Sequence, residues 1–386
     1  MNFLILSCKT GGGHDAAANA LKQQLELDGH EAFVFDYLTL RSENTAKKVG
    51  SFYVKTVQNI PSAFGVAYKI ALAWAKRTRR SPVYAFNTAM VKYLKEYLDK
   101  NAYDGIICTH LYPAETLTSM KRRGIPVPPF FFVYTDYTTI PFVEETRADE
   151  YISPHPALVP ESVSRGLPLD KLHPFGIPVS PKITEKRDQN ECKRHLGLDE
   201  NKKTVLLIGG SMGAGNLTLL ADAFKKSSPE NVQIAVICGS NKKVFDELNQ
   251  KYFGDPLFKI FGKTDEMPLF MTAADVIYTK PGGLTSTEAV ASRKPLVLIY
   301  PIPGCETFNR EFFVTLKMAV TADEPDELVA KGLNLLTDDE ARETMINAQI
   351  KNIDENATEN AAQFIITRTV EIKKERELAK KQDENA

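Results

Sequence analysis

Short apolar runs alternate with amphipathic stretches along almost the whole chain. In the first half, the runs NFLILSC, EAFVFDYL, GIICTH and PPFFFVYTD are separated by segments with helical periodicity, such as AAANALKQQLELDGH. The second half repeats this plan with KTVLLIGGS, VQIAVICGS, FKIFGK, DVIYTK and KPLVLIY. Continuous apolar strands that alternate with helices are typical of a parallel sheet covered on both faces. The pattern therefore predicts an α/β protein with two Rossmann-like parallel-sheet domains.

A proline-rich segment over residues 173–188 separates the two halves. Pro174, Pro178 and Pro181 oppose a helix and favour an extended linker, so we place the domain boundary near Pro178. The length of 386 residues also suits two domains of ordinary size. The predicted units are an N-terminal domain, a C-terminal domain, and a charged helix with its tail: residues 1–178, 179–364 and 365–386.

The composition excludes several classes of protein. Hydrophobic residues make up 43% and charged residues 25% of the chain, which is typical of a soluble globular protein and excludes wholesale disorder. The five cysteines are scattered without a CxxC pair, so they indicate neither a zinc site nor a disulfide framework. The start MNFLILSC has the pattern of a first strand, and no apolar run reaches about 18 residues. We therefore expect a cytoplasmic protein without a transmembrane helix.

The charge is unevenly distributed, although the net charge is only −1. Residues 41–100 contain twelve basic and three acidic residues. Within them, the helical stretch GVAYKIALAWAKRTRR places Lys69, Lys76 and Arg80 on one face. The opposite face carries Ala67, Ile70, Ala71 and Trp74. Such a basic amphipathic helix is typical of a membrane interface, which predicts peripheral attachment to the anionic inner face of the cell membrane.

Two other interpretations of this segment compete with membrane attachment. The helix would also suit a core-facing position with a solvated basic face. Binding to nucleic acid is the weaker interpretation, because the sequence shows no known module that combines basic and aromatic residues. We therefore expect no nucleic-acid partner.

The first glycine-rich loop, Lys9–His14, follows the first predicted strand and leads directly into a helix. Its three glycines allow a tight turn, but the loop has neither the Lys-Ser/Thr of a P-loop nor the GxGxxG pattern. His14 lies at the helix N-terminus, facing the ends of the strands. A histidine there is a candidate general base near pH 7, and the alternative is a capping or structural histidine.

Three loops of the second half also follow strand ends: Gly209–Asn216, Thr279–Glu288 and Pro301–Asn309. Ligands of parallel sheets bind outside the carboxyl ends of the strands. The first two loops begin helices with glycines, and the free N–H groups at such a terminus favour a diphosphate. Glu288 is a candidate for ribose hydroxyls or else an exposed helix residue. Glu306 and Asn309 share a helix face and are candidates for the hydroxyls of a sugar.

These motifs together resemble one enzyme family. The stretch MPLFMTAADVIYTKPGGLTSTEAVASRKPLVLIYPIPGCETFNREFF resembles the donor domain of glycosyltransferase family 28. GGGHDAAANAL resembles the opening of monogalactosyldiacylglycerol synthases and of bacterial processive diacylglycerol glucosyltransferases, and GIPVSP and VICGSN resemble further elements of these enzymes. The resemblance implies the two-domain glycosyltransferase-B architecture, in which the domains face a cleft. It also implies a membrane-side acceptor on the N-terminal domain, a UDP-sugar on the C-terminal domain, and an inverting transfer without a metal or other cofactor.

The resemblance assigns a role to each matching residue. His14 corresponds to the general base, and Asp136 is our alternative candidate for that role. The diphosphate contacts correspond to Gly210, Ser211, Gly213, Gly282, Gly283 and Thr285. The contacts to uracil, ribose and the transferred sugar correspond to Thr264, to Glu288, and to Glu306 and Asn309.

We therefore expect an inverting transferase that moves glucose or galactose from a UDP-sugar to diacylglycerol or a related membrane lipid. The choice of sugar stays open, because Gly304-Cys305-Glu306 stands where relatives have Gly-Gln-Glu. The nearest alternative is a UDP-GlcNAc-dependent transferase that acts on a lipid-linked peptidoglycan precursor. A nucleotide-sugar epimerase and a non-catalytic membrane sensor of UDP-sugar are the remaining alternatives.

Overall fold

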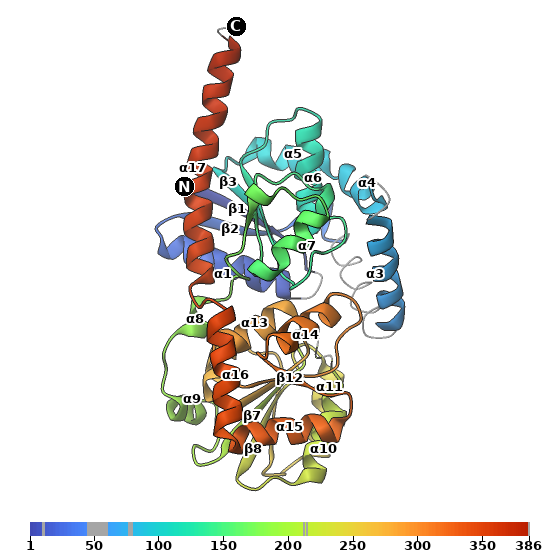
Figure 1. Ribbon diagram of the computed structural model, residues 1–386, viewed down its shortest axis with the longest axis vertical. Helices are drawn as coiled ribbons and strands as arrows, with labels where there is room; N and C mark the ends of the chain where they lie inside the picture. The colour runs from blue at the N-terminus through green and yellow to red at the C-terminus, as the bar shows by residue number, and fades with distance from the viewer. Residues whose placement is uncertain (10–11, 45–60, 76–79, 211–212, 214, 385–386) are drawn as a thin grey trace.

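The protein consists of two α/β lobes, one above the other in Figure 1. The computed structural model describes residues 1–9, 12–44, 61–75, 80–210, 213 and 215–384. Each lobe contains a six-stranded sheet in which every pair of neighbouring strands is parallel. The predicted α/β fold with two parallel-sheet domains is confirmed.

The sheet of the N-terminal lobe has the strand order β2-β1-β3-β4-β5-β6. Its strands are β1 Asn2–Ser7, β2 Glu31–Asp36, β3 Gly105–Cys108, β4 Phe130–Val133, β5 Glu150–Ile152 and β6 Leu172–His173. Along β1, Phe3 and Ile5 belong to one apolar cluster, and Leu4 and Leu6 belong to another. Successive side chains of a strand point to opposite faces, so both faces of this sheet are covered.

The helices of this lobe lie on both faces of the sheet. They are α1 Gly13–Leu27, α3 Pro61–Ala75, α4 Pro82–Thr88, α5 Val91–Lys100, α6 Leu111–Arg122 and α7 Val159–Ser164, with 3-10 turns at Tyr37–Leu40, Val143–Glu145, Pro156–Leu158 and Leu169–Lys171. Ala18 and Leu21 of α1 pack on the face that carries Phe3 and Ile5. Leu117 of α6 packs on the opposite face.

The sheet of the C-terminal lobe has the order β12-β11-β10-β7-β8-β9. Its strands are β7 Lys203–Ile208, β8 Val232–Ile237, β9 Phe258–Phe261, β10 Val276–Thr279, β11 Leu296–Leu298 and β12 Val320–Thr321. Its helices are α8 Pro181–Thr184, α9 Gln189–His195, α10 Leu217–Ser227, α11 Lys242–Lys251, α12 Met267–Ala273, α13 Gly283–Ala291, α14 Cys305–Thr315, α15 Pro325–Thr337 and α16 Asp339–Asn352. Two apolar clusters cover the two faces of this sheet.

The last helix, α17 Ala357–Glu384, returns to the N-terminal lobe (Figure 1). Ala361 and Ile365 join the apolar cluster around β1. The chain thus crosses between the lobes twice, once after β6 and once before α17. A hydrogen bond joins the two crossings, in which Val179 N donates to Thr358 Oγ1 over 2.9 Å. The limits expected for the three units stay a prediction.

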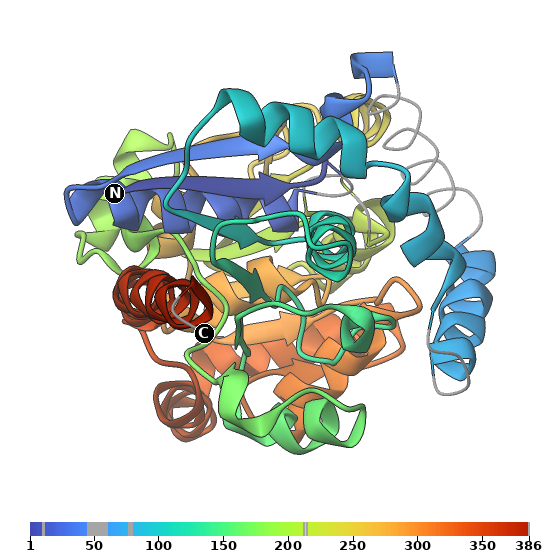
Figure 2. The same cartoon turned by 90° about the horizontal axis from the view of Figure 1, so that it is seen from above.

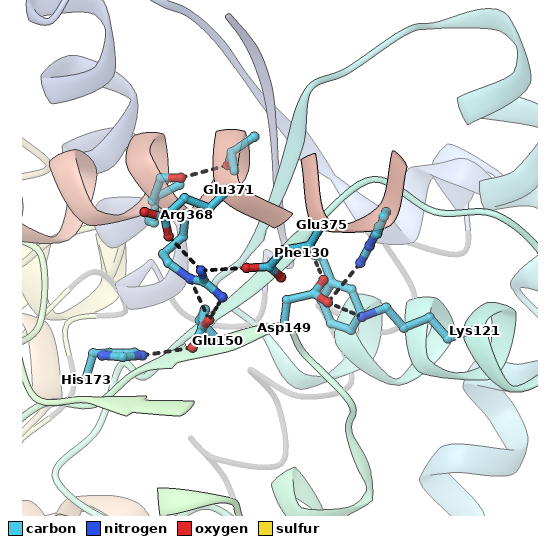
Figure 3. Close-up of polar contacts among 11 residues, drawn as sticks. Lys121, Phe130, Asp149, Glu150, His173, Arg368, Glu371 and Glu375 are labelled. Carbon is cyan, nitrogen blue, oxygen red and sulfur yellow. Dashed lines mark hydrogen bonds and ion pairs between the residues drawn. The ribbon is translucent and has the colours of Figure 1, made fainter. Parts of the chain in front are cut away.

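Ion pairs hold α17 against the N-terminal lobe (Figure 3). Arg368 Nη2 lies 2.8 Å from Glu150 Oε1, and His173 Nε2 lies 2.8 Å from Glu150 Oε2. Arg376 Nη2 lies 2.8 Å from Asp149 Oδ1. The charges that make this segment look like a solvated tail in the sequence are therefore partly used to dock the helix.

Candidate active site between the two domains

His14 lies at the start of α1, directly after the glycine-rich turn. Gly12 caps the helix with φ of 71°, a left-handed conformation that glycine adopts without steric cost. His14 Nδ1 lies 2.7 Å from Thr109 O and 3.1 Å from Thr135 Oγ1. A carbonyl oxygen can only accept, so Nδ1 carries the proton and Nε2 of the neutral ring keeps its lone pair. This tautomer suits a general base.

A second histidine, His110, packs against the ring of His14. The ring of His110 meets that of His14 edge to face, with the centroids 4.6 Å apart. Burial lowers the pKa of His14, although the hydrogen bond to Thr109 and the charge of Asp15 oppose the effect. Burial and the neighbouring His14 lower the pKa of His110 well below its usual value. The sequence analysis did not single out His110, whose only signal is its place at the end of the run GIICTH.

Asp136 faces His14 across a small enclosed cavity that Thr135 and His110 also line. Burial raises the pKa of Asp136 to about 6, against the opposing effect of a hydrogen bond from Asn309. The structure thus brings together the predicted base and the alternative candidate, both on the N-terminal domain.

Asn309 joins the two domains through its fully buried side chain. Its Nδ2 donates to Asp136 Oδ1 over 2.8 Å and to Pro281 O over 3.0 Å. Its Oδ1 accepts from Tyr137 N over 2.7 Å. In this arrangement the amide is occupied by the protein itself, and its expected contact with the sugar stays a prediction.

The loop Thr279–Glu288 approaches the N-terminal domain so closely that a side chain at Gly283 has no room. A Cβ atom at Gly283 would collide with the Thr135 carbonyl group. Gly283 is the first residue of α13, with Gly282 as its cap. The N-terminus of α13 therefore lies against the segment that carries Asp136, and its contact with a diphosphate stays a prediction.

The remaining donor candidates lie around this terminus or farther along the same edge of the sheet. Thr285 and Glu288 are half-buried on α13, and burial raises the pKa of Glu288 to about 7. Gly213 has φ of 58°, and a Cβ there would collide with Cys238 O. Thr264 precedes α12, and its Oγ1 accepts from Glu266 N over 3.0 Å. Ser211 lies outside the described residues.

Glu306 lies in the first turn of α14, and its carboxylate is already engaged in two contacts. Its Oε2 accepts from Ile302 N over 2.8 Å, and its Oε1 pairs with the ammonium group of Lys280. Lys280 directly precedes the Pro-Gly-Gly turn, yet the sequence analysis assigned it no role. The roles predicted for these donor residues stay predictions.

The predicted membrane helix α3 extends along the side of the molecule, beside both lobes (Figures 1 and 2). Val66, Ile70 and Trp74 follow one another at intervals of four residues and are 58%, 58% and 43% exposed. Lys69 is exposed beside this apolar stripe, and Arg80 is exposed after the helix. Lys76 lies outside the described residues.

The other sides of α3 contact both domains. Ala71 and Ala75 pack on the core of the N-terminal domain. At Gly65 a Cβ would lie 2.6 Å from Cβ of Pro303 in the C-terminal domain. Within the described residues, no helix combines the length and the apolar character that crossing a membrane requires.

Sequence comparisons match both halves of the chain. Residues 14–179 match the family model for monogalactosyldiacylglycerol (MGDG) synthase, and residues 188–352 match that for glycosyl transferases group 1. A processive diacylglycerol beta-glucosyltransferase of Staphylococcus carnosus is 31% identical over 355 residues, which cover 88% of this chain and 85% of the relative. The enzyme of the same description from Bacillus pumilus is 27% identical over 347 residues, covering 89% and 88%.

Solved structures share the fold at low sequence identity. MurG of Acinetobacter baumannii is 15% identical with a TM-score of 0.61, over 95% of this chain and 99% of that one. A putative UDP-N-acetylglucosamine 2-epimerase of Listeria monocytogenes is 14% identical with a TM-score of 0.63, over 96% and 98%. HepE of Anabaena, in complex with UDP and glucose, is 15% identical with a TM-score of 0.55, over 95% and 99%.

The fold alone does not separate transferases from epimerases, because both occur among these structures. The sequence relatives do separate them. The family model over the N-terminal half describes an enzyme of glycolipid synthesis, and so do the names of relatives that match nearly the whole chain. The chain belongs to glycosyltransferase family 28, with the monogalactosyldiacylglycerol synthases and the processive diacylglycerol β-glucosyltransferases.

Proposed function

We propose that this protein transfers glucose from UDP-glucose to diacylglycerol, with inversion at the anomeric carbon. Family membership makes the chain a hexosyltransferase that acts on a lipid. Its relatives from Bacillus pumilus and Staphylococcus carnosus are named as glucosyltransferases. The observation that carries the proposal is His14, whose Nε2 keeps its lone pair beside the junction where α13 meets the N-terminal domain.

In the proposed mechanism, His14 Nε2 takes the proton from the acceptor hydroxyl. The hydroxyl oxygen forms a bond to the anomeric carbon, while the bond from that carbon to the diphosphate oxygen breaks and UDP departs. The transition state has oxocarbenium character, as in glycoside hydrolysis. The N-termini of α13 and of the helix after Gly213 stabilise the negative charge that develops on the diphosphate.

The acceptor is expected to arrive from a membrane surface at α3. The exposed stripe of Val66, Ile70 and Trp74 supplies apolar area, and Lys69 supplies charge for anionic headgroups. Because α3 also contacts Pro303 of the C-terminal domain, a membrane bound at α3 lies beside the loop predicted to hold the sugar. We therefore propose peripheral attachment to the inner face of the cell membrane.

The test is to incubate the full chain with vesicles that contain diacylglycerol and with radiolabelled UDP-glucose or UDP-galactose. Chromatography of the lipid fraction then identifies the products. We expect labelled glucosyldiacylglycerol and little product from UDP-galactose. Unlabelled UDP-GlcNAc is added as a competitor, because a peptidoglycan-type enzyme would prefer it. Lipid labelling from UDP-galactose alone, or none from either donor, contradicts the proposal.

A further inference from the structure

Lys280 belongs to Thr279–Glu288, one of the two glycine loops predicted to hold the diphosphate, and its side chain reaches Gly210 of the other. It follows β10 and directly precedes the Pro-Gly-Gly turn that begins α13. A Cβ at Gly210 would lie 2.8 Å from Lys280 Cε, and a Cβ at Gly282 would lie 3.2 Å from Lys280 Nζ. The ammonium group therefore occupies the space that both loops enclose.

The partner of this ammonium group is a carboxylate predicted to bind the transferred sugar. Lys280 Nζ pairs with Glu306 Oε1, and the two side chains are only 12% and 13% exposed. A mostly buried ion pair loses much of its hydration, so it persists only where the two charges stay close or another partner replaces one of them. Diphosphate is such a replacement partner, since it carries more negative charge than a carboxylate.

Both charges also act on the reaction centre. Burial is the main reason why the pKa of Asp136 is raised, but Glu306 raises it further and Lys280 lowers it. The ion pair thus lies within electrostatic reach of Asp136, which follows β4 of the N-terminal domain and lines the same small cavity as His14. An ammonium group at this place would stabilise the charge that develops on the departing diphosphate.

We infer that Lys280 exchanges Glu306 for the diphosphate when UDP-glucose binds, which releases the Glu306 carboxylate for the hydroxyls of the glucose. The inference rests on the proposed function. Lysine suits the exchange, because its ammonium group is a compact charge with three donors on a flexible stem. Glu306 stays in place meanwhile, since Ile302 N donates to its other oxygen. When UDP leaves, the ion pair forms again.

The test uses two substitutions with opposite expected effects on the binding of UDP, measured by calorimetry with the full chain. Lys280→Met should weaken UDP binding about 10- to 100-fold, as the loss of a hydrogen bond to a charged group does. Glu306→Gln should tighten it about two- to fivefold, because Lys280 no longer has to leave an ion pair. Glu306→Gln should nevertheless lower the turnover rate with UDP-glucose, since the sugar loses its carboxylate.

Lys193→Met is the matched control. Lys193 Nζ lies 3.3 Å from Asp275 Oδ2, and the Lys193 side chain is 5% exposed. Asp275 directly precedes β10, whereas Lys280 directly follows it, so the two ion pairs lie at opposite ends of this strand. The control should lower the melting temperature and leave UDP affinity unchanged. If Lys280→Met does not fold, Glu306→Gln decides the question by the sign of its effect.

Unchanged UDP affinity in folded Lys280→Met overturns the inference, and so does weaker UDP binding in Glu306→Gln. If the wild type meanwhile binds UDP and labels diacylglycerol, the proposed function stands without this exchange. A folded wild type that neither binds UDP nor labels lipid overturns both.

Discussion

Each domain brings a glycine-rich loop between a strand and a helix to the reaction centre, but the two loops hold opposite kinds of side chain. The N-terminal loop leads to His14, whose pKa burial lowers. The C-terminal loop, Thr279–Glu288, contains Lys280, which is held in an ion pair with Glu306. In the proposed mechanism, the same local architecture serves proton transfer in one domain and charge stabilisation in the other. The two loops differ because His14 is hydrogen-bonded to the backbone of Thr109, whereas Lys280 is paired with the carboxylate of Glu306.

The largest expected effect comes from the neutral side of this comparison. His14→Ala should lower the turnover rate about 10²- to 10⁴-fold, because a positioned base typically contributes that much. UDP affinity should stay the same, since the diphosphate candidates lie in the other domain. Steady-state kinetics and calorimetry on one preparation measure both quantities.

His195→Ala is the control, since this histidine is exposed on α9 and pairs with Glu266 at 2.7 Å. A His14→Ala enzyme that turns over within about threefold of wild type would show that another residue is the base, with Asp136 the next candidate.

The next largest effect concerns the contact between the domains. Asn309→Ala removes three hydrogen bonds around Asp136, Pro281 and Tyr137. The unpaired groups should lower the turnover rate by about 10- to 100-fold, equivalent to about 1.5–3 kcal/mol. Asn334→Ala, on the exposed face of α15, is the control.

Comparing the affinities of the Asn309→Ala enzyme for UDP and for UDP-glucose sharpens the assignment. Weaker binding of UDP-glucose alone would show that Asn309 contacts the sugar, as the family resemblance implies. Equal affinities with a reduced turnover rate would show that it acts through the domain contact. An unchanged turnover rate contradicts both roles.

A smaller effect concerns the pH dependence of stability. The pKa of Asp136 is about 6 in the folded protein, above the unfolded value of about 3.9, so the folded state binds its proton more tightly. The buried charge therefore destabilises the fold above about pH 6, and this effect vanishes as the pH falls below about 4. Asp136→Asn should raise the free energy of unfolding at pH 7.5 by about 2 kcal/mol or less.

Denaturant unfolding of wild type and Asp136→Asn at pH 7.5 and pH 4 checks this prediction. The two proteins should differ at the higher pH and converge at the lower. A difference that is the same at both pH values would show that the substitution acts through packing rather than through the carboxylate charge.

The smallest effect is expected at the membrane helix. Lys69→Glu should reduce binding to anionic vesicles about five- to tenfold, because each basic residue near such a surface contributes about 1 kcal/mol. Added salt should reduce the binding of wild type to anionic vesicles and so narrow the difference in binding between wild type and Lys69→Glu. Vesicle sedimentation measures it, with Lys242→Glu on α11 as the control for net charge. Equal binding of wild type to neutral and anionic vesicles would contradict the electrostatic part of the proposal.

Local patterns in the sequence were sufficient for the fold and for the loops. Parallel strands buried on both faces are apolar throughout, and strand ends followed by glycines and helices show where a ligand site forms. The amphipathic pattern of α3 likewise predicted an exposed helix, but it placed Ala71 on the same face as Trp74. In the structure Ala71 packs on the N-terminal core, and Val66 joins Ile70 and Trp74 on the exposed stripe.

By itself, the sequence determined the two parallel sheets, the position of His14 at a helix start and the glycine loops that approach it, because these depend on neighbours along the chain. Only the tertiary structure decided which distant side chains meet, within each domain and, for Asn309 and Asp136, between the domains. His110 against His14, Asn309 against Asp136, and Lys280 against Glu306 are 96, 173 and 26 residues apart. No local periodicity encodes such contacts, since they arise when elements distant in the sequence pack together in the folded protein. The same packing buries Asp136 and so sets its pKa, which composition and spacing do not determine.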